Sequence, residues 1–448
     1  MPYESNFDEI YNFVAQKFEG ENEYLQAVRE VLHDIIPIYN ANESYKRDDI
    51  VRRLCFPERV IYFTVSWMNS SGDIEVNQGW RVQHNSAMGP YKGGLRFHPT
   101  VNLSVLKFLA FEQCFKNALT GLPMGGGKGG ADFNPKGRSD RDIMLFCQAF
   151  MRELQRHIGA NTDVPAGDIN VGAREIGYLY GEYRRLNNKF EGVLTGKGLE
   201  FGGSYVRTEA TGFGLIYFLD AVCKQHNTDI EGKNIVVSGA GNVALHAALK
   251  ATQKGAKVIS LSNSRGTLYK QNGFDEPAIK FAIAEHAKSN NILTDLADKG
   301  IGDWKKGKTP WHLTCDIALP CATQNELDRD DALTLVNNGC NMVLEGANMP
   351  CTDEAQDVFK DKALVYVPGK ASNAGGVALS GLEMSQNAMF SQRNADTLDE
   401  QLQSIMLSIH ERCVEEGKDT ANNYIDYMKG ANIAAFRRLA DAIVAQGV

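Results

Sequence analysis

Residues 234–261 read NIVVSGAGNVALHAALKATQKGAKVISL, and this stretch decides the fold. The short apolar run Asn234–Ser238 is rich in β-branched residues, as buried strands are, and a glycine turn follows it. The next residues, to about Lys254, have the composition of a helix, and Lys257–Leu261 is a second apolar strand. This order predicts a parallel sheet with a right-handed crossover. Further strands are expected at 317–319, 342–344 and 363–367.

The turn between the two strands carries the pattern Gly239-Ala-Gly241-Asn-Val-Ala244. Gly239 permits the tight turn, and Gly241 lets backbone N–H groups approach a pyrophosphate at the helix N-terminus. Ala244 is small enough for close packing of helix on strand. The pattern alone also fits a plain strand–helix turn, but its place inside a βαβ unit favours a dinucleotide site.

The end of the second strand indicates which dinucleotide is bound. A site for NAD usually places Asp or Glu there, to accept from the ribose 2′-hydroxyl. No carboxylate occurs here before Asp275, and the turn residues are Ser262, Asn263, Ser264 and Arg265. Hydroxyl, amide and guanidinium groups donate to a 2′-phosphate, which a carboxylate would repel. We therefore expect NADP, the alternative being a polar turn with no ligand.

A second region, residues 84–130, differs in charge from the rest of the chain. It holds five Lys and Arg residues against one Glu, a balance of +4 in a chain of net charge −8. An apolar stretch between its glycine-rich ends predicts a helix from Leu103 to Leu119, with Gln113 and Lys116 on one face. Lysines between glycine loops favour a pocket for a small polyanion. Taken singly, Lys92 or Lys116 fits a side chain that reaches solvent equally well.

Lys128 has glycines on both sides, in the run 125–130. We expect a glycine loop that leaves room for a ligand beside one long side chain. The spacing excludes a nucleoside-triphosphate loop, because Leu122 replaces the first glycine and Gly129 stands where Ser or Thr would bind magnesium. A lysine in a partly dry site with other cations has a lowered pKa, which suits proton transfer or carbonyl polarisation. The alternative is a flexible surface loop.

Asp163 and Asp168 enclose a stretch that we expect to be a loop before a helix starting near Gly172. A carboxylate in this position is either a helix N-cap or a catalytic group, and the spacing alone favours the cap. The nine histidines form no H-E-x-x-H motif and the nine cysteines no C-x-x-C pair. We therefore expect no metal site, and reduced thiols.

The composition excludes several classes of protein. A length of 448 residues suggests two or three domains, and 43% apolar with 23% charged residues is ordinary for a globular chain. The net charge of −8, with no basic tail, argues against nucleic acid and anionic membranes as partners. No apolar run is long enough to span a bilayer, and the polar start does not read as a secretory signal. We expect a cytoplasmic protein that acts on small molecules.

These residues together resemble the hexameric glutamate dehydrogenase family, and most closely its short, NADP-linked bacterial and fungal type. Six separated motifs carry the resemblance in the family's order. They are Pro90–Pro99, Leu122–Pro135, the segment ending at Asp168, Thr208–Gly212, Glu345–Pro350 and Asn373–Ser380. The resemblance implies reversible reductive amination of 2-oxoglutarate by ammonium and NADPH, which gives L-glutamate.

The resemblance also implies an α/β architecture of two domains with the active site in the cleft between them. Residues 1–203, joined by the C-terminal helix 427–448, would form the substrate-binding and oligomerisation domain. Residues 204–426 would form a Rossmann-type NADP-binding domain, and the glycine-rich segment 194–203 is the expected hinge. A homohexamer is implied as the assembly.

Each matching residue receives an implied role. Lys128 is the catalytic lysine and Asp168 the proton-transfer carboxylate, in place of the cap that spacing favours. The residues implied to hold substrate are Lys92 and Ser380 at its distal carboxylate, and Gln113, Lys116 and the Gly167 backbone at its α-carboxylate. Those implied to contact coenzyme are Thr211, Asn242 and Val243, with Asn348 and Asn373 near the nicotinamide. Asn263 stands where many relatives carry an acid, which strengthens the expectation of NADP.

Two alternatives stay open. The first is a dehydrogenase of an apolar amino acid. Such a substrate has no distal carboxylate for a cation to bind, so Lys92 argues against this function. A non-catalytic NADP-binding sensor would be expected to have lost Lys128 or Asp168, and both are present.

Overall fold

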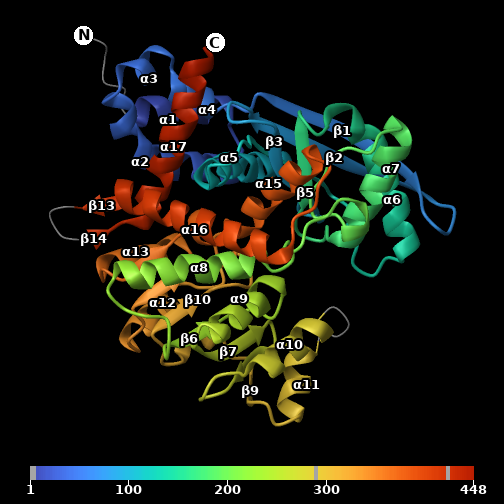
Figure 1. Cartoon of the computed structure of the whole chain (residues 1–448). Helices are drawn as coiled ribbons and strands as arrows, with labels where there is room; N and C mark the ends of the chain where they lie inside the picture. Colours follow the sequence, from blue (N-terminus) through green and yellow to red (C-terminus); the bar gives the residue numbers. More distant parts are fainter. Residues whose placement is uncertain (1–6, 287–290, 420–423, 448) are drawn as a thin grey trace. The chain divides into compact units, whose positions relative to one another are not determined.

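The structure is a computed structural model that describes residues 7–286, 291–419 and 424–447, and it divides into two compact units (Figure 1). The first unit comprises Met1–Arg207, Val377–Leu398 and Asn432–Val448, and the second comprises Thr208–Gly376 and Asp399–Ala431. Three of the boundaries fall inside helices, namely α15 (Gly375–Ala388), α16 (Ala395–Gly417) and α17 (Tyr427–Gln446). The expected functional domains, with limits at 203 and 426, stay a prediction, as does the position of the active site.

The first unit, taken by itself, is a mixed sheet with helices on its faces. In the described residues this sheet has five strands in the order β1-β2-β4-β3-β5. They are β1 (Arg59–Met68), β2 (Ile74–Asn85), β3 (Tyr91–Phe97), β4 (Gly126–Ala131) and β5 (Asp163–Gly167). β1, β2 and β4 pair antiparallel, whereas β4, β3 and β5 pair parallel. The parallel part brings the ends of β3 and β5 to one edge.

The helices of the first unit lie before, between and after these strands. They are α1 (Phe7–Lys17), α2 (Asn22–Asn40), α3 (Glu43–Arg47), α4 (Ile50–Leu54), α5 (Leu103–Thr120), α6 (Asp140–Leu154) and α7 (Ala173–Asn187), with short 3₁₀ turns η1 (Gln155–His157) and η2 (Leu199–Phe201). Helix α5 confirms the expected span. The Asn102 side chain accepts from the Val105 N–H at 2.9 Å, and Gly121 ends the helix in the left-handed region at φ 78°.

The glycine-rich stretch around Lys128 is a buried strand, so the expected loop was wrong. β4 lies against α5, and a Cβ placed on Gly126 would lie 2.2 Å from the Cys114 Sγ. A Cβ on Gly129 would lie 3.0 Å from the Arg81 Cδ. Close packing against neighbouring side chains therefore requires these glycines. They do not indicate space for a ligand. The segment starting at Asp163, expected as a loop, is likewise the strand β5.

An aromatic core holds this sheet against α6 and α7. Phe97 on β3, Phe133 after β4, and Phe146 and Phe150 on α6 are all buried. The rings of Phe133 and Phe146 stack at 3.8 Å between centroids. Burial of each ring contributes roughly 1.5–3 kcal/mol, so the strands that carry Lys128 and Arg96 rest on a rigid support.

The second unit confirms the expected parallel sheet. Within the described chain its sheet has seven strands in the order β12-β11-β10-β6-β7-β8-β9. The strands are β6 (Asn234–Val237), β7 (Lys257–Asn263), β8 (Gly266–Tyr269), β9 (Asp303–Lys306), β10 (Ile317–Leu319), β11 (Met342–Leu344) and β12 (Val365–Val367). β12 to β7 are parallel, whereas β8 and β9, which the sequence did not indicate, are short antiparallel additions.

The first strand, β6, lies between β7 and β10, so the chain leaves it in one direction and later returns on its other side. This is the switch point at which open α/β sheets bind ligands. The remaining elements of the unit are α8 (Ala210–Gln225), α9 (Asn242–Gln253), α10 (Glu276–Glu285), α11 (Ile292–Asp298), η3 (Pro310–His312), α12 (Arg329–Asn337), α13 (Asp353–Asp361), α14 (Gly369–Ser372), β13 (Lys418–Asp419) and β14 (Tyr424–Ile425).

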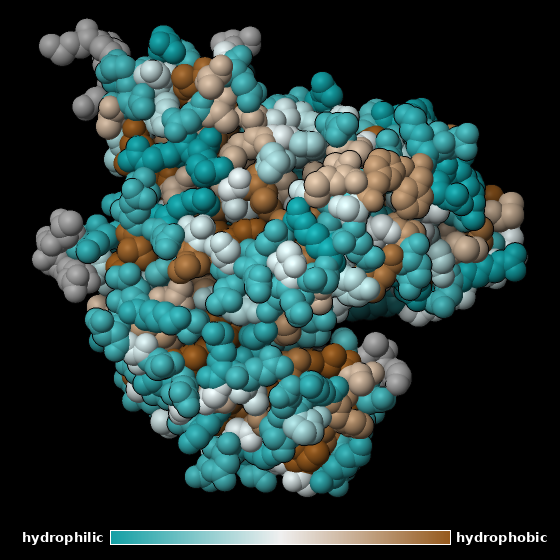
Figure 2. All heavy atoms as spheres, viewed as in Figure 1, coloured by the Kyte–Doolittle hydropathy of each residue, from teal (hydrophilic) through white to brown (hydrophobic). Residues whose placement is uncertain are grey.

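The surface and the cysteines fit a globular chain. Figure 2 shows a mostly hydrophilic surface on the viewed face, interrupted by separate hydrophobic patches. All nine cysteines are buried and free. In the part of the chain that the structure describes, no helix combines the length and the apolar character needed to cross a membrane.

Candidate functional site

Three strands of the first unit bring opposite charges together. The Nζ of Lys128, on β4, donates to Asp168 Oδ1 at 2.7 Å. The Nε of Arg96, on β3, donates to Asp168 Oδ2 at 2.7 Å, and Asp168 itself directly follows β5. Because β4, β3 and β5 are neighbours in register, the sheet positions all three groups. One carboxylate is thus shared by two cations.

The shared carboxylate changes the protonation of its partners. Burial lowers the pKa of Lys128, and the charge of Asp168 opposes that shift only in part. Burial by itself would raise the pKa of Asp168, but Lys128 and Arg96 hold it well below its usual range. Asp168 is therefore ionised in this arrangement. An ammonium group has three N–H donors, so Lys128 keeps donors for a further acceptor.

Asp168 does not cap the following helix. The N-cap of α7 is Gly172, whose N–H donates to the Glu175 Oε2 at 2.8 Å. The interpretation of Asp168 as an N-cap, which spacing favoured, was therefore wrong. Its side chain turns instead to Lys128 and Arg96.

Lys92 forms a second buried cationic position. It lies on β3, is 1% exposed, and donates through Nζ to the Val164 carbonyl at 2.9 Å. Burial holds the pKa of Lys92 well below its ordinary value, and the charges of Arg207 and Arg81 lower it further. A carboxylate placed beside this amine would restore its charged form. The position is therefore ready for an anionic group.

Helix α15 contributes to the same surroundings. Glu383, on α15, raises the pKa of Lys92 and accepts from the Lys197 Nζ at 2.8 Å. Ser380 is 2% exposed and lies one helical turn before Glu383, which places the two on one face. Arg207 is close enough for its charge to act on Lys92, and its Nε has no partner among the described residues.

Lys116 and Gln113 lie on one face of α5, as expected. Burial and the charge of Lys128 lower the pKa of Lys116 to about 8, so these two lysines are near one another. The Gln113 Nε2 donates to Asn117 Oδ1 at 2.6 Å. Gly167 ends β5, one residue before Asp168. The first unit therefore gathers every lysine that the sequence singled out.

Sequence reasoning missed the ion pair beneath this cluster. Arg81, on β2, donates through Nε to Asp163 Oδ2 at 2.9 Å and through Nη2 to Oδ1, and both side chains are completely buried. Gln83 donates to the same carboxylate at 3.0 Å. Asp163, the second candidate for a cap, is therefore a structural counter-charge. Neither Arg81 nor Glu383 lies in a local motif that could have identified it. Arg96, by contrast, lies in the motif Pro90–Pro99 and in the basic region 84–130.

The second unit presents the glycine turn as expected. Gly239 has φ 88°, and its N–H donates to the Ser262 Oγ at 3.0 Å. A Cβ on Gly239 would lie 3.1 Å from the Cys321 carbonyl oxygen, whereas a Cβ on Gly241 would meet nothing within 4 Å. Gly241 is the N-cap of α9. The turn thus leaves the helix N-terminus open to a ligand, which fits a pyrophosphate.

The end of β7 is a tight hairpin to β8, in which Asn263 pairs with Gly266. Ser264 and Arg265, at its tip, are exposed. The Arg265 N–H donates to Asn263 Oδ1 at 2.9 Å, and its Nη1 donates to Asn291 Oδ1 at 2.6 Å. The donor set of this turn fits a phosphate group, and the turn carries no carboxylate.

Other expected coenzyme residues meet at the start of α8 and α9. The Asn242 Nδ2 donates to the Thr208 carbonyl at 2.5 Å, which ties these two helix starts together. A Cβ on Gly212 would lie 2.7 Å from the Val243 carbonyl oxygen, so the backbones touch here. Thr211 precedes Gly212 on α8 and thus lies in the turn of α8 that packs against the start of α9.

Asn348, which follows β11, and Asn373, which caps the end of α14, form a second pair. The Asn373 Nδ2 donates to Asn348 Oδ1 at 3.1 Å and to the Ala347 carbonyl at 2.9 Å. Glu345 lies close to Asn373, because a Cβ on Gly369 would lie 2.9 Å from the Asn373 Nδ2 and 3.3 Å from the Glu345 Oε2. Glu345 accepts from the Tyr366 hydroxyl and the Gly369 N–H, each at 2.7 Å. Burial raises the pKa of Glu345 to about 7. The ends of β7, β6 and β11 thus carry three groups of expected coenzyme residues.

No group of three or more His, Cys, Asp or Glu side chains suited to a metal ion occurs among residues 7–286, 291–419 and 424–447.

Two family models match the chain. Residues 57–185 match the Glu/Leu/Phe/Val dehydrogenase dimerisation domain, and residues 202–447 match the Glutamate/Leucine/Phenylalanine/Valine dehydrogenase model. The chain belongs to the Glu/Leu/Phe/Val dehydrogenase family. Its fold is the family's two-domain α/β fold, with an N-terminal dimerisation domain and a C-terminal dinucleotide-binding domain.

This Glu/Leu/Phe/Val dehydrogenase is similar to proteins of both coenzyme types. It is 52% identical to the NAD-specific glutamate dehydrogenase of Bacteroides fragilis, over 99% of this chain and 100% of that one. It is 51% identical to the NADP-specific glutamate dehydrogenase of Salmonella typhimurium, over all of both chains. The crystal structure of Plasmodium falciparum glutamate dehydrogenase has a TM-score of 0.96 and 50% identity, over 99% of this chain and 94% of that one. Overall sequence similarity therefore does not distinguish specificity for NAD from specificity for NADP.

Proposed function

We propose that the chain is an NADP-dependent glutamate dehydrogenase, which aminates 2-oxoglutarate with ammonium and NADPH to L-glutamate, reversibly. The observation that carries this proposal is the pair of buried cationic positions on adjacent strands, Lys128 with Asp168 on one side and Lys92 on the other. A substrate with a carboxylate and a 2-oxo group fits these two positions, because a carboxylate beside Lys92 would restore its charged form and Lys128 keeps N–H donors for a carbonyl oxygen. The relatives that bear the name glutamate dehydrogenase support it.

Substrate binding follows from these charges. Lys92 and Ser380 hold the distal carboxylate, with the charge of Arg207 beside them. Lys116 and Gln113, with the Gly167 backbone, hold the α-carboxylate. The 2-oxo group then lies where an N–H of Lys128 polarises it, and the buried surroundings strengthen that hydrogen bond.

Asp168 handles the proton of the nucleophile. It is ionised beside Lys128 and Arg96, and it accepts a proton from ammonium so that neutral ammonia attacks the 2-oxo carbon. When Lys128 turns its N–H groups to the substrate, Asp168 loses a partner and becomes a stronger base. One proton passes from the attached nitrogen to the former 2-oxo oxygen, and Lys128 donates a second, so that this oxygen leaves as water while the C=N bond of an iminium forms. A bound nicotinamide coenzyme supplies the hydride that completes the reaction.

The coenzyme part of the proposal rests on the turn after β7. Ser262, Asn263, Ser264 and Arg265 offer donors and no carboxylate to the group on the ribose 2′ position. We expect Asn263→Asp to shift the ratio of kcat/KM for NADPH to that for NADH at least tenfold toward NADH, since a carboxylate repels a phosphate. Ser264→Ala, on the same turn, is the control and introduces no charge. An unchanged ratio in Asn263→Asp contradicts this assignment.

We also infer self-association, and a homohexamer is the proposed assembly. β1 is an edge strand of the first unit, and its outer face with that of β2 exposes large apolar side chains. They are Val60, Tyr62, Met68, Ile74 and Val76. An exposed apolar edge strand is a site for pairing with another copy. Sedimentation velocity tests this, and a monomer would contradict it. The cytoplasmic location and the lack of nucleic-acid and membrane partners stay predictions from the sequence.

The deciding experiment is a steady-state assay of 2-oxoglutarate amination with NADPH and with NADH, run beside 2-oxo acids that have apolar side chains. We expect the highest kcat/KM for 2-oxoglutarate with NADPH. A higher value for an apolar 2-oxo acid would assign the chain to that branch of the family. Binding of coenzyme with no turnover on any of these acids would support the sensor alternative.

A further inference from the structure

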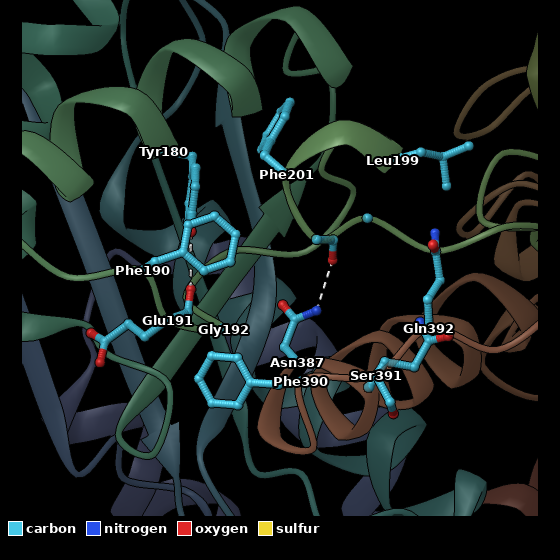
Figure 3. A pocket seen from close by; sticks show the side chains of 13 residues that line it. Tyr180, Phe190, Glu191, Gly192, Leu199, Phe201, Asn387, Phe390, Ser391 and Gln392 are labelled. Carbon is cyan, nitrogen blue, oxygen red and sulfur yellow. Dashed lines mark hydrogen bonds between the residues drawn. The ribbon is translucent and has the colours of Figure 1, made fainter.

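A pocket in the first unit lies apart from the residues assigned above (Figure 3). It has a volume of about 270 Å³ and is formed by α7, residues 190–203 and the end of α15 with the turn after it. Its apolar lining consists of Tyr180, Phe190, Leu199, Phe201 and Phe390. Phe190 is 56% exposed and Phe390 82% exposed. Large rings gathered at a concave surface are typical of ligand sites.

One polar group in the wall lacks a hydrogen-bond partner. Gln386 is 1% exposed, and its Oε1 accepts from the Arg393 N–H at 2.8 Å. Its Nε2 is buried with no partner among the described residues. The adjacent Asn387, by contrast, donates to the Gly202 carbonyl at 2.7 Å, as Figure 3 shows. A buried N–H without an acceptor is costly, so a turn of the Gln386 side chain toward the pocket, where an acceptor atom of a ligand would satisfy the N–H, is favoured.

The backbone holds Phe390 in an unfavourable conformation. Its φ is 50°, in the left-handed region that helix ends normally give to glycine. The Phe390 N–H donates to the Asn387 carbonyl at 3.2 Å, and the Ser391 N–H to the Gln386 carbonyl at 3.1 Å. A bulky residue kept in such a position is typical of ligand clamps. Glycine would fit this backbone better, so replacing Phe390 removes the ring without harming the turn.

The charge of the lining limits the ligand. Glu191 is the one charged residue that lines the pocket among the described residues, and it accepts a hydrogen bond from the Tyr183 hydroxyl. No Lys, Arg or His in the described chain lines it. A carboxylate or phosphate ligand would therefore meet repulsion and no counter-charge.

We propose that this pocket binds an uncharged, flat ring compound that carries one hydrogen-bond acceptor, of the class of an aromatic carboxamide. The rings of Tyr180, Phe190 and Phe390 contact the faces or edges of the ligand ring. The Gln386 side chain turns toward the ligand, and its Nε2 donates to the carbonyl oxygen of the ligand. The small volume excludes a whole nucleotide.

Hydrogen bonds connect the two segments that line the pocket with the surroundings of the substrate residues. Residues 190–203 carry Gly196, whose N–H donates to Glu383 Oε2 at 2.9 Å, and Lys197, which pairs with the same carboxylate. Glu383 lies one turn before Gln386 on α15, and its charge acts on Lys92. A bound ligand that fixes these two segments therefore changes the affinity for 2-oxoglutarate. This part of the inference rests on the proposed function.

Binding is tested first, by calorimetric or NMR titration of the full-length protein with benzamide, benzoate and cyclohexanecarboxamide. We expect benzamide to bind at least tenfold more tightly than the other two, because benzoate is charged and cyclohexanecarboxamide is not flat. Phe390→Gly and Gln386→Glu should each weaken benzamide binding tenfold or more. Phe281→Ala, which removes a 36% exposed ring of the second unit, is the matched control and should bind normally. Equal binding of benzoate, or full binding by Phe390→Gly, overturns the proposal.

Two further readouts separate the possibilities. Sedimentation of Phe390→Gly must match the wild type, since a changed oligomeric state would make the rings a subunit contact and overturn the proposal. Saturating benzamide should change the KM for 2-oxoglutarate at least twofold in the wild type and not in Phe390→Gly. An unchanged wild-type KM overturns the link to substrate. The titration needs no turnover, so it decides the pocket even where 2-oxoglutarate proves not to be the substrate.

Discussion

The two candidate sites of this chain consist of different kinds of chemical groups. In the first unit, charged side chains from β2, β3, β4 and the end of β5 surround one another, and each buried charge has a counter-charge or a carbonyl. In the second unit, the Gly239 turn offers backbone N–H groups and uncharged side chains at strand ends. The first arrangement depends on the identity of each side chain, whereas the second depends on backbone shape. Substitutions should therefore fail in different ways in the two units.

The largest expected effect is on turnover, at the shared carboxylate. We expect Lys128→Ala or Asp168→Asn to lower kcat by three to four orders of magnitude, about 4–5 kcal/mol, with the melting temperature little changed. The physical reason is the loss of the polarising N–H in one case and of the base in the other. Lys136→Ala, an exposed lysine of the same unit, is the control in a steady-state assay. Near-normal turnover in either variant would remove that residue from the mechanism.

The ion pair beneath the lysines should govern stability. Arg81→Met leaves the Asp163 carboxylate buried without its main counter-charge, although Gln83 still donates to it. We expect a loss of about 3 kcal/mol in the free energy of unfolding, the low end for a broken buried pair. Arg138→Met breaks the more exposed pair with Glu75 and should cost under about 1 kcal/mol in the same denaturant titration. Equal losses would show that burial does not decide the cost.

The glycine turn separates stability from binding. Gly239→Ala forces a Cβ onto a φ of 88° and against the Cys321 carbonyl, so we expect a loss of about 1–2 kcal/mol in stability and weaker coenzyme binding. Gly241→Ala meets no atom and should keep the stability, yet weaken coenzyme binding at least tenfold by blocking the helix start. Calorimetric melting and coenzyme titration measure both. A Gly241→Ala protein that binds normally would place the ligand elsewhere.

The smallest effect concerns pH and Glu345. Its pKa is about 7 in the folded protein, above the ordinary value, so between pH 5 and 7 the folded state holds a proton that the unfolded state has lost. Stability therefore falls as pH rises through this window. Tyr366→Phe removes a donor to the ionised carboxylate, so it should destabilise by roughly 1 kcal/mol more at pH 8 than at pH 5. Melting curves of both proteins at the two pH values test this, and a pH-independent difference would contradict it.

The same contrast explains what the sequence could predict. The βαβ unit, the Gly239 turn and the caps of α5 depend on residues close together in the chain, and local patterns indicate them well. The glycines around Lys128 looked like a loop because their packing partners, Cys114 and Arg81, come from other segments. Asp168 looked like a cap because nothing local shows that Glu175 satisfies Gly172.

The residues that complete the first site could not be found locally. Arg81 and Glu383 lie far along the chain from the carboxylate and the lysine that they pair with. Only the separated motifs, taken as a family resemblance, connected such distant positions. The coenzyme preference is harder still, because NAD-specific and NADP-specific relatives are equally similar to the chain as a whole.

The division of the chain has a consequence for its synthesis. The first unit needs Val377–Leu398 to supply the Glu383 counter-charge of Lys197, and Asn432–Val448 to complete its packing. A ribosome builds the chain from its N-terminus, so the unit that begins first is finished last. While the second unit is being made, Lys197 has no carboxylate from α15. The incomplete first unit therefore waits for its last segments while Thr208–Gly376 and Asp399–Ala431 are synthesised. A fragment that stops at Arg207 should not fold.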